Sequence, residues 1–142
     1  MLNISGLNQG VVIDHIQAGL AMKIYAYLNL DKSGCCVAVI KNAKSNKMGK
    51  KDIIKIEGPI DVDLDILGVL DHKITINVIE DGKIIKKLNP SLPEQVSNVI
   101  KCINPRCITS IEQGLMHRFK LTNKEEGIYR CVYCEQKFNK AD

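Results

Sequence analysis

CINPRC at residues 102–107 and CVYC at residues 131–134 place four cysteines in the last third of the chain. Their spacing is C-x4-C, then 23 residues, then C-x2-C. Two turns that each present a pair of thiolates typically form a tetrahedral Zn²⁺ site, and four protein ligands leave no coordination position open for a substrate. The pattern therefore predicts a structural zinc ion held by Cys102, Cys107, Cys131 and Cys134.

Two other interpretations of the cysteines compete with this one. A catalytic zinc needs an open position, and the nearby His117 lies in an expected strand without an HxxE or HxE context. A redox dithiol at CVYC needs a helix that begins after Cys131, and the EQKF that follows is a poor helix start. The structural site is therefore the prediction we carry forward.

A turn with two prolines, NPSLPE at residues 89–94, separates the cysteine-bearing segment from the rest of the chain. Because Pro90 and Pro93 both interrupt regular structure, we predict two domains, residues 1–93 and residues 94–142. The second domain is expected to consist of short β segments, with residues 93–100 either extended or a helical turn. It is too small to fold on a hydrophobic core alone, so a bound metal would supply the missing stability.

The pattern of the first domain predicts an α+β fold. The chain has no Trp and only two Phe, so its core must be built from Ile, Leu and Val, which favour strands. The expected elements, in order, are a strand (9–16), a largely buried helix (18–30), a hairpin (35–43 and 50–58), a short helix (61–70) and a hairpin with a Glu-Asp-Gly turn (73–88). Helices between antiparallel hairpins predict a ferredoxin-like antiparallel sheet with two helices, joined to a small C-terminal β domain that resembles a zinc ribbon.

Lysines are concentrated in the first hairpin, where six lie between residues 41 and 55 with Asp52 as the only acid. The two-residue period of a strand puts Lys51, Ile53 and Lys55 on one face. Two ammonium groups around an aliphatic side chain suit a polyphosphate beside an apolar ring, but a solvated strand face has the same pattern. There is no glycine-rich phosphate loop, and Asp14 with His15 belongs to no recognisable catalytic set.

Charge argues against nucleic acid as the partner, although the formal net charge is +4. Residues 94–142 carry 8 basic and 6 acidic side chains, and four thiolates around one Zn²⁺ would cancel that excess. Aromatic and basic residues do not interleave as in single-strand binders. A zinc-ribbon protein that binds nucleic acid remains the alternative, and a zinc-dependent or redox enzyme comes third.

We expect a cytoplasmic protein without membrane association. The first residues, MLNISGLNQG, have neither the basic start nor the apolar run of a signal peptide, and no stretch approaches the length of a membrane span. In a reducing compartment clustered cysteines indicate metal or redox chemistry rather than structural disulfides. The adjacent Cys35 and Cys36 are expected to be small strand residues.

Several motifs together resemble the regulatory chain of aspartate carbamoyltransferase. In order, they are GVVIDHI (10–16), MGKKDIIKIE (48–57), KITINVIEDG (73–82), PSLPE (90–94) and the two cysteine pairs. The resemblance covers nearly the whole chain. It implies a non-catalytic subunit with an allosteric N-terminal domain and a zinc domain that docks on the catalytic chain. It also implies regulatory-chain homodimers, and CTP or UTP as inhibitors that compete with the activator ATP for one site.

The resemblance also assigns the nucleotide site. The base would contact residues 4–7 and the strand with Asn77 and Ile79, and the ribose and phosphates would meet charged side chains. The full set carried over is Asp14, His15, Lys51, Ile53, Lys55, Asn77, Ile79, Ile84 and Lys87. The sequence departs from better-known members at Gly82 and Ser5 near the base, and at Arg106 and Gln136 on the surface that would face the catalytic chain.

Overall fold

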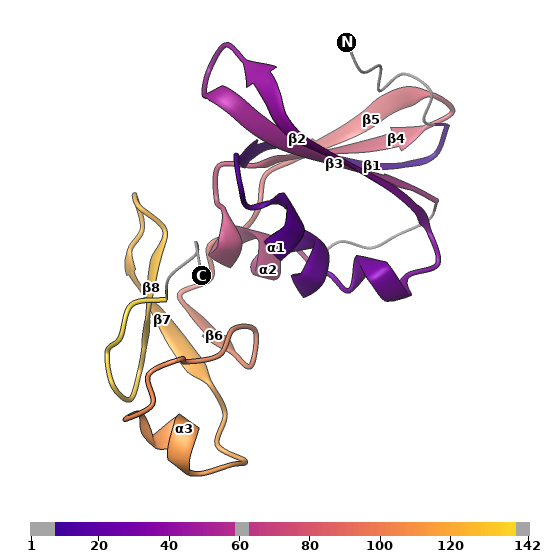
Figure 1. The fold of residues 1–142 in the computed structure, drawn as a ribbon. Coiled ribbons are helices and arrows are strands. Elements are labelled where there is room, and N and C mark those ends of the chain that lie inside the picture. Colours follow the sequence, from indigo (N-terminus) through magenta and orange to yellow (C-terminus); the bar gives the residue numbers. More distant parts are fainter. Residues whose placement is uncertain (1–7, 59–62, 139–142) are drawn as a thin grey trace.

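The computed structural model describes residues 8–58 and 63–138, which form two sheets (Figure 1). The larger sheet contains β1 (Gly10–Gln17), β2 (Cys36–Ser45), β3 (Gly49–Glu57), β4 (Thr75–Glu80) and β5 (Lys83–Leu88). The smaller contains β6 (Gln95–Ser97), β7 (Arg118–Asn123) and β8 (Ile128–Cys131). The helices are α1 (Ala21–Tyr27), α2 (Leu64–Leu70) and α3 (Ile108–Ile111), with a 3₁₀ turn, η1 (Leu30–Lys32). The predicted α+β class is confirmed.

The larger sheet has the strand order β2-β3-β1-β4-β5, and every neighbouring pair is antiparallel. Its first four strands, with α1 and α2 in the connections, form the predicted ferredoxin-like arrangement, and β5 extends one edge. The turn between β4 and β5 is the predicted hairpin turn. Asp81 and Gly82 both take left-handed backbone angles there, with φ of 53° and 74°, which this tight turn requires.

The alternation of side chains gives the larger sheet two different faces. Val11 and Ile13 of β1 point toward the helices and belong to the main core, whereas Val12 belongs to a separate apolar cluster on the other side. Figure 1 shows α1 and α2 under one face of the sheet, and no helix of the described ranges covers the opposite face. We call this opposite side the open face.

One core-facing position of β3 carries a carboxylate instead of an aliphatic side chain. Asp52 is 0% exposed, and its Oδ2 accepts hydrogen bonds from the backbone N–H groups of Gly19 at 3.0 Å and Ala21 at 3.2 Å. Its Oδ1 accepts a third from the N–H of Asn42 at 3.0 Å, where β2 has an irregular register. Asp52 therefore joins the start of α1 and the β2 irregularity to β3.

Helix α1 is shorter and more exposed than predicted. It ends before Asn29, whose left-handed φ of 54° redirects the chain into η1. Only one side of α1, with Ala21 and Ile24, is fully buried, and Met22 on the outer side is 49% exposed. Its uniformly apolar sequence predicted a largely buried helix. That prediction was wrong because the outer side chains have no layer to pack against among the described residues.

The smaller unit has a core of its own. β7 pairs with β6 on one side and β8 on the other, and Val96, Ile100, Phe119 and Tyr129 pack around the buried cysteines. The hydroxyl of Tyr129 donates to the carbonyl of Pro93 at 2.6 Å. Of the two structures expected for residues 93–100, the extended one is found at β6.

The two units are in direct contact. Phe138 packs against both cores, with its ring edge-on to Phe119 at a centroid distance of 6.1 Å, and the Nζ of Lys23 lies 5.1 Å from its centroid. A Cβ at Gly68 of α2 would overlap the carbonyl oxygen of Ser91, so glycine allows the connecting segment to lie against the helix. None of the helices in the described ranges is long and apolar enough to cross a membrane.

The three hydrogen bonds of Asp52 lead to a test of the fold. Replacing Asp52 with Ala leaves three backbone donors around a buried position without an acceptor, so we expect the free energy of unfolding to fall by about 3 kcal/mol or more. Urea denaturation measures this change. Asp31→Ala, at an exposed site, is the control and is expected to stay within about 0.5 kcal/mol of the parent chain. Equal denaturation midpoints for the two variants would contradict the role of Asp52.

Candidate metal centre and open sheet face

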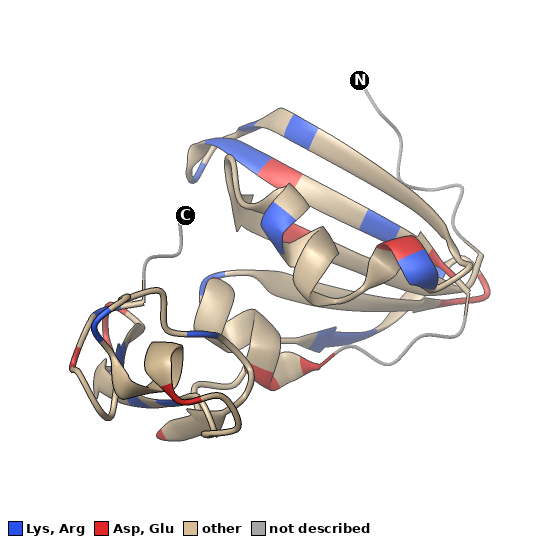
Figure 2. Cartoon of the chain, turned by 60° about the horizontal axis from the view of Figure 1, so that its bottom comes forward, with Lys and Arg blue, Asp and Glu red and all other residues tan. Residues whose placement is uncertain are grey.

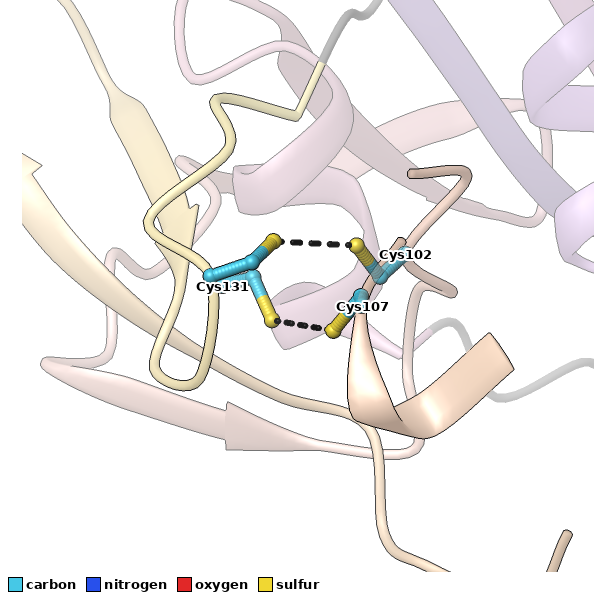
Figure 3. Close-up of side chains that lie close together, drawn as sticks. Cys102, Cys107 and Cys131 are labelled. Carbon is cyan, nitrogen blue, oxygen red and sulfur yellow. Dashed lines mark hydrogen bonds between the residues drawn. The ribbon is translucent and has the colours of Figure 1, made fainter. Parts of the chain in front are cut away.

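The four predicted cysteine ligands meet at one point. Their Sγ atoms all lie within 4.8 Å of one another, with 3.6 Å between Cys102 and Cys134 and 3.7 Å between Cys107 and Cys131. Figure 3 shows the sulfur atoms of Cys102 and Cys107 directed toward the side of the site that carries Cys131. A tetrahedral ion with metal–sulfur bonds of about 2.3 Å requires sulfur separations of about 3.8 Å. The cluster therefore fits a structural metal ion with four thiolate ligands.

Neighbouring groups hold these sulfur atoms in place. The hydroxyl of buried Thr109 donates to Sγ of Cys107 at 3.1 Å, and the backbone N–H of Gln136 donates to Sγ of Cys134 at 3.5 Å. Such hydrogen bonds fix ligand orientation in metal sites. Sequence reasoning missed Thr109, for which the only signal was a hydroxyl residue two positions after a ligand. His117 supports the loop through Nδ1, which accepts from the N–H of Cys102 at 3.2 Å.

The wide C-x4-C loop is shaped by Asn104. Its side-chain oxygen accepts from the N–H of Arg106 at 3.0 Å, and its carbonyl accepts from the N–H of Cys107 at 3.0 Å and the hydroxyl of Ser110 at 2.7 Å. This compact turn leaves Ile103 64% exposed. The loop therefore presents an apolar side chain to solvent next to a metal-binding cysteine.

The redox interpretation of CVYC requires a helix that begins after Cys131, and the structure has a turn there. Cys131 is the last residue of β8, and residues 132–134 form a turn. No helix begins there to lower a thiol pKa.

The open face brings together most residues of the predicted nucleotide site. Val12 lies across from Lys55 on β3 and Asn77 on β4, and Asn77 lies across from Lys87 on β5. Cross-strand partners share a face of the sheet, so these side chains point the same way. The residues placed on this face are Asp14, Lys51, Ile53, Lys55, Asn77, Ile79, Ile84 and Lys87.

An apolar patch occupies the middle of this face. Val12, Ile53 and Ile79 form a cluster of buried side chains, and Ile40 and Ala43 pack against it. Asn77 is 8% exposed, and its Oδ1 is buried without a hydrogen-bond partner among the described residues. Sequence reasoning missed Val12, although its place two residues before Asp14 on one strand face was a usable signal.

Asp14 and His15 lie at an irregularity of β1. The pairing of β1 with β3 shifts register between Ile13 and Ile16, and His15 has a φ of 60°. This shift lets both Ile13 and Ile16 reach the core while Asp14 faces the other side, where its Oδ1 lies 2.9 Å from Nζ of Lys51. The segment at residues 4–7, including Ser5, lies outside the described residues.

Charge is spread over both units. Figure 2 shows basic segments on strands of the larger sheet and on the smaller unit, with acidic segments among them. The strand register adds which face each side chain is on, and it sets Lys51, Lys55 and Lys87 on the face that carries the apolar patch.

The thiols differ in acidity when no metal is bound. Burial raises the pKa of Cys102 to about 12, and burial also raises the pKa of Cys131. Burial opposes ionisation of Cys107 too, but hydrogen bonds from the hydroxyl and the backbone N–H of Thr109 outweigh it and lower its pKa to about 7. Metal binding must therefore displace protons from Cys102 and Cys131 at neutral pH.

This proton release predicts a pH dependence of metal affinity. Because the two raised thiols lose protons on binding, the logarithm of the affinity for Zn²⁺ is expected to rise by at least about two for each pH unit between about pH 7 and pH 8. Below about pH 7 the slope is expected to steepen, since Cys107 then also starts protonated. Competition with a chelator at a series of pH values measures this, with Cys36→Ser as a control that keeps the slope. An affinity independent of pH would rule out four thiolate ligands.

Comparison with known proteins agrees with both units. A family model described as "Aspartate carbamoyltransferase regulatory chain, allosteric domain" matches residues 2–91, and a second, described as "Aspartate carbamoyltransferase regulatory chain, metal binding domain", matches residues 94–142. Similar proteins carry the name aspartate carbamoyltransferase regulatory chain.

Three of these relatives span nearly the whole chain. The one from Clostridium acetobutylicum is 50% identical over 141 residues, covering 99% of this chain and 97% of the relative. The one from Clostridium tetani is 53% identical over 137 residues (96% and 95%), and the one from Bifidobacterium longum is 42% identical over 135 residues (95% and 97%). The chain therefore belongs to the family of aspartate carbamoyltransferase regulatory chains, which are non-catalytic subunits with an allosteric and a metal-binding domain.

Proposed function

We propose that this chain binds nucleoside triphosphates on the open face of its larger sheet and passes their effect to aspartate carbamoyltransferase catalytic chains that dock on the metal-binding unit. CTP and UTP act as inhibitors and ATP as an activator, and they compete for one site. The protein thereby controls pyrimidine biosynthesis in the cytoplasm. The observation that carries the proposal is an apolar patch on the open face, with lysines around it and with a buried amide oxygen that has no hydrogen-bond partner among the described residues.

The patch suits a nucleobase. Val12, Ile53 and Ile79 offer an aliphatic surface for a planar ring, and Oδ1 of Asn77 is a buried acceptor to which no group of the described residues donates. Leaving such a group unpaired is unfavourable, so a ligand amino group there would gain a hydrogen bond at little desolvation cost. Both cytosine and adenine carry an exocyclic amino group, which agrees with one site for inhibitor and activator.

The surrounding charges suit the ribose and phosphates. Lys51, Lys55 and Lys87 lie on the same face as the patch, and ammonium groups bind phosphate oxygens as point charges. Asp14 holds Lys51 through its ion pair and keeps a second carboxylate oxygen for a sugar hydroxyl. His15 lies next to Asp14 at the β1 irregularity. In this proposal Ile84, across from Ile79 on β5, extends the patch toward the sheet edge.

Two lysines of β5 provide a matched test of the site. Lys87 pairs with Asn77 and faces the patch, whereas its neighbour Lys86 pairs with Val78 and faces the other way. Lys87→Ala is expected to weaken CTP binding by about tenfold, from the loss of one charge-assisted contact, and Lys86→Ala to leave it nearly unchanged. Calorimetric titration of both variants measures the two dissociation constants. If both changes weakened CTP binding equally, the affinity would depend only on net charge, and the proposed site would be refuted.

The docking surface in this proposal lies around the metal centre. Ile103, Ile111 and Tyr133 are 64%, 65% and 44% exposed, an unusual number of large apolar side chains for one small unit. Ile103 and Tyr133 lie within two residues of metal-binding cysteines in sequence, and Ile111 is four residues after Cys107. Contiguous exposed apolar groups mark protein interfaces. Arg106 and Gln136, where the sequence departs from better-known members, are exposed nearby. The metal, which we propose to be zinc, then holds the loop that forms this surface, and residues 94–142 act as the docking domain.

If the chain docks in this way, binding of the catalytic trimer depends on both the metal and the apolar surface. Ile103→Asp is expected to weaken binding to an aspartate carbamoyltransferase catalytic trimer by at least about tenfold, because it removes a central apolar contact, while zinc content stays at one per chain. Removing zinc with a chelator is expected to release the catalytic trimer altogether. Analytical ultracentrifugation measures association with the trimer in both experiments. The control is Lys124→Asp, in the turn between β7 and β8. A complex that survives chelation would contradict the clamp role of the metal.

The proposal also includes a regulatory-chain homodimer formed through the larger sheets, and it excludes nucleic acid as a partner. A titration with DNA or RNA distinguishes it from the zinc-ribbon alternative. Tight binding with a steep dependence on salt, together with no calorimetric signal from CTP or ATP, would favour the alternative.

A further inference from the structure

A cavity of about 320 Å³ lies where the two units meet, and neither the four cysteines nor the residues placed on the open face line it. Its floor is apolar and comes from both units, with Leu20 and Leu70 on one side and Ile128 and Phe138 on the other. A volume near 300 Å³ is at the lower end of the range for small-molecule pockets, which often form at domain junctions. The cavity therefore has room for a compact ligand with an apolar part.

The charged residues of the cavity are balanced in sign. Asp71 and Glu126 supply two carboxylates, and Lys73 and Lys137 supply two ammonium groups. Asp71 is 6% exposed and is held in place because its carboxylate accepts from the backbone N–H groups of Gln17 at 2.9 Å and Lys73 at 3.1 Å. Two carboxylates would repel a polyphosphate, so the balance favours a ligand that carries one charge of each sign.

His72 adds an acceptor to this set. Its Nε2 lies 3.1 Å from the carbonyl oxygen of Glu125 in the other unit, and a carbonyl can only accept, so in the neutral ring Nε2 carries the hydrogen. The other nitrogen, Nδ1, is then an acceptor. It is buried, and no group of the described residues donates to it. A ligand with an ammonium group would satisfy Nδ1 and a carboxylate together.

From these features we infer that the cavity binds a free amino acid with an apolar or aromatic side chain. The side chain lies on the floor of Leu20, Leu70, Ile128 and Phe138, the α-ammonium group faces Asp71, Glu126 and His72, and the α-carboxylate faces the lysines. Because both units form the walls, such a ligand would also stabilise their contact. The inference does not depend on nucleotide binding, since none of these residues lies on the open face.

Titration of the zinc-loaded chain with L-phenylalanine tests the inference. Methyl signals of Leu20, Leu70 and Ile128 in NMR spectra are expected to shift with a dissociation constant on the order of 1 mM, typical of a ligand of this size. Two analogues that each lack one charge, 3-phenylpropanoate and 2-phenylethylamine, are expected to bind at least about fivefold more weakly. Absence of saturable shifts with L-phenylalanine, or equal binding of all three compounds, would overturn the inference and leave only an apolar void.

Exposed charged residues supply variants that should fold normally. Glu126→Gln is expected to lower the preference for L-phenylalanine over 3-phenylpropanoate, and Lys137→Ala the preference over 2-phenylethylamine, because each removes one of the charges that face that end of the ligand. The neighbouring changes Glu125→Gln and Lys124→Ala, outside the cavity, are the controls and are expected to keep both preferences. Lys87→Ala should leave L-phenylalanine binding unchanged, which separates this site from the effector site. Unaltered preferences in Glu126→Gln and Lys137→Ala would refute the assignment of the two charged ends.

Discussion

The carboxylate of Asp52 is the constraint on which the larger sheet depends. It is fully buried, and its partners belong to the loop before α1, the first residue of α1 and the irregular part of β2. Once Asp52 faces the core, the two-residue period of β3 sends Lys51, Ile53 and Lys55 to the open face. A slip of one residue would bury two ammonium groups and expose Asp52, so the register that builds the core also builds the candidate effector site.

The smaller unit depends on a different source of stability, a metal site. Its hydrophobic cluster is small, and three of the eight buried members are cysteines that also line the metal centre. A bound ion therefore adds folding free energy where apolar burial is limited. The turn formed by Asn104 between two of these cysteines leaves Ile103 exposed, so the residues that stabilise this unit also shape its apolar surface.

Alternation, turn residues and cysteine spacing predicted most of the fold. Period-two patterns predicted the strands β1, β3 and β4, and the Asp-Gly turn predicted the second hairpin. The two cysteine pairs predicted a metal site, and their sulfur atoms do lie together. The exposure of Met22 was missed because a sequence does not tell which side of an apolar helix lacks a neighbour. Thr109 was missed because the cysteine two residues before it is the more conspicuous residue, and Val12 was missed because its cluster partners Ile53 and Ile79 are distant in sequence.

No local sequence pattern predicted the contact between the two units. Phe138 near the C-terminal end packs against both cores, under the ammonium group of Lys23 from α1, and Val69 of α2 belongs to the cluster of the smaller unit. The helices that cover the core face of the larger sheet are therefore also the elements that touch the metal-binding unit. A ligand on the open face that moves β1 or β3 relative to these helices would therefore act on that unit. Asp52 ties β3 to α1, so the interaction that sets the sheet register is also placed to carry a displacement from one unit to the other.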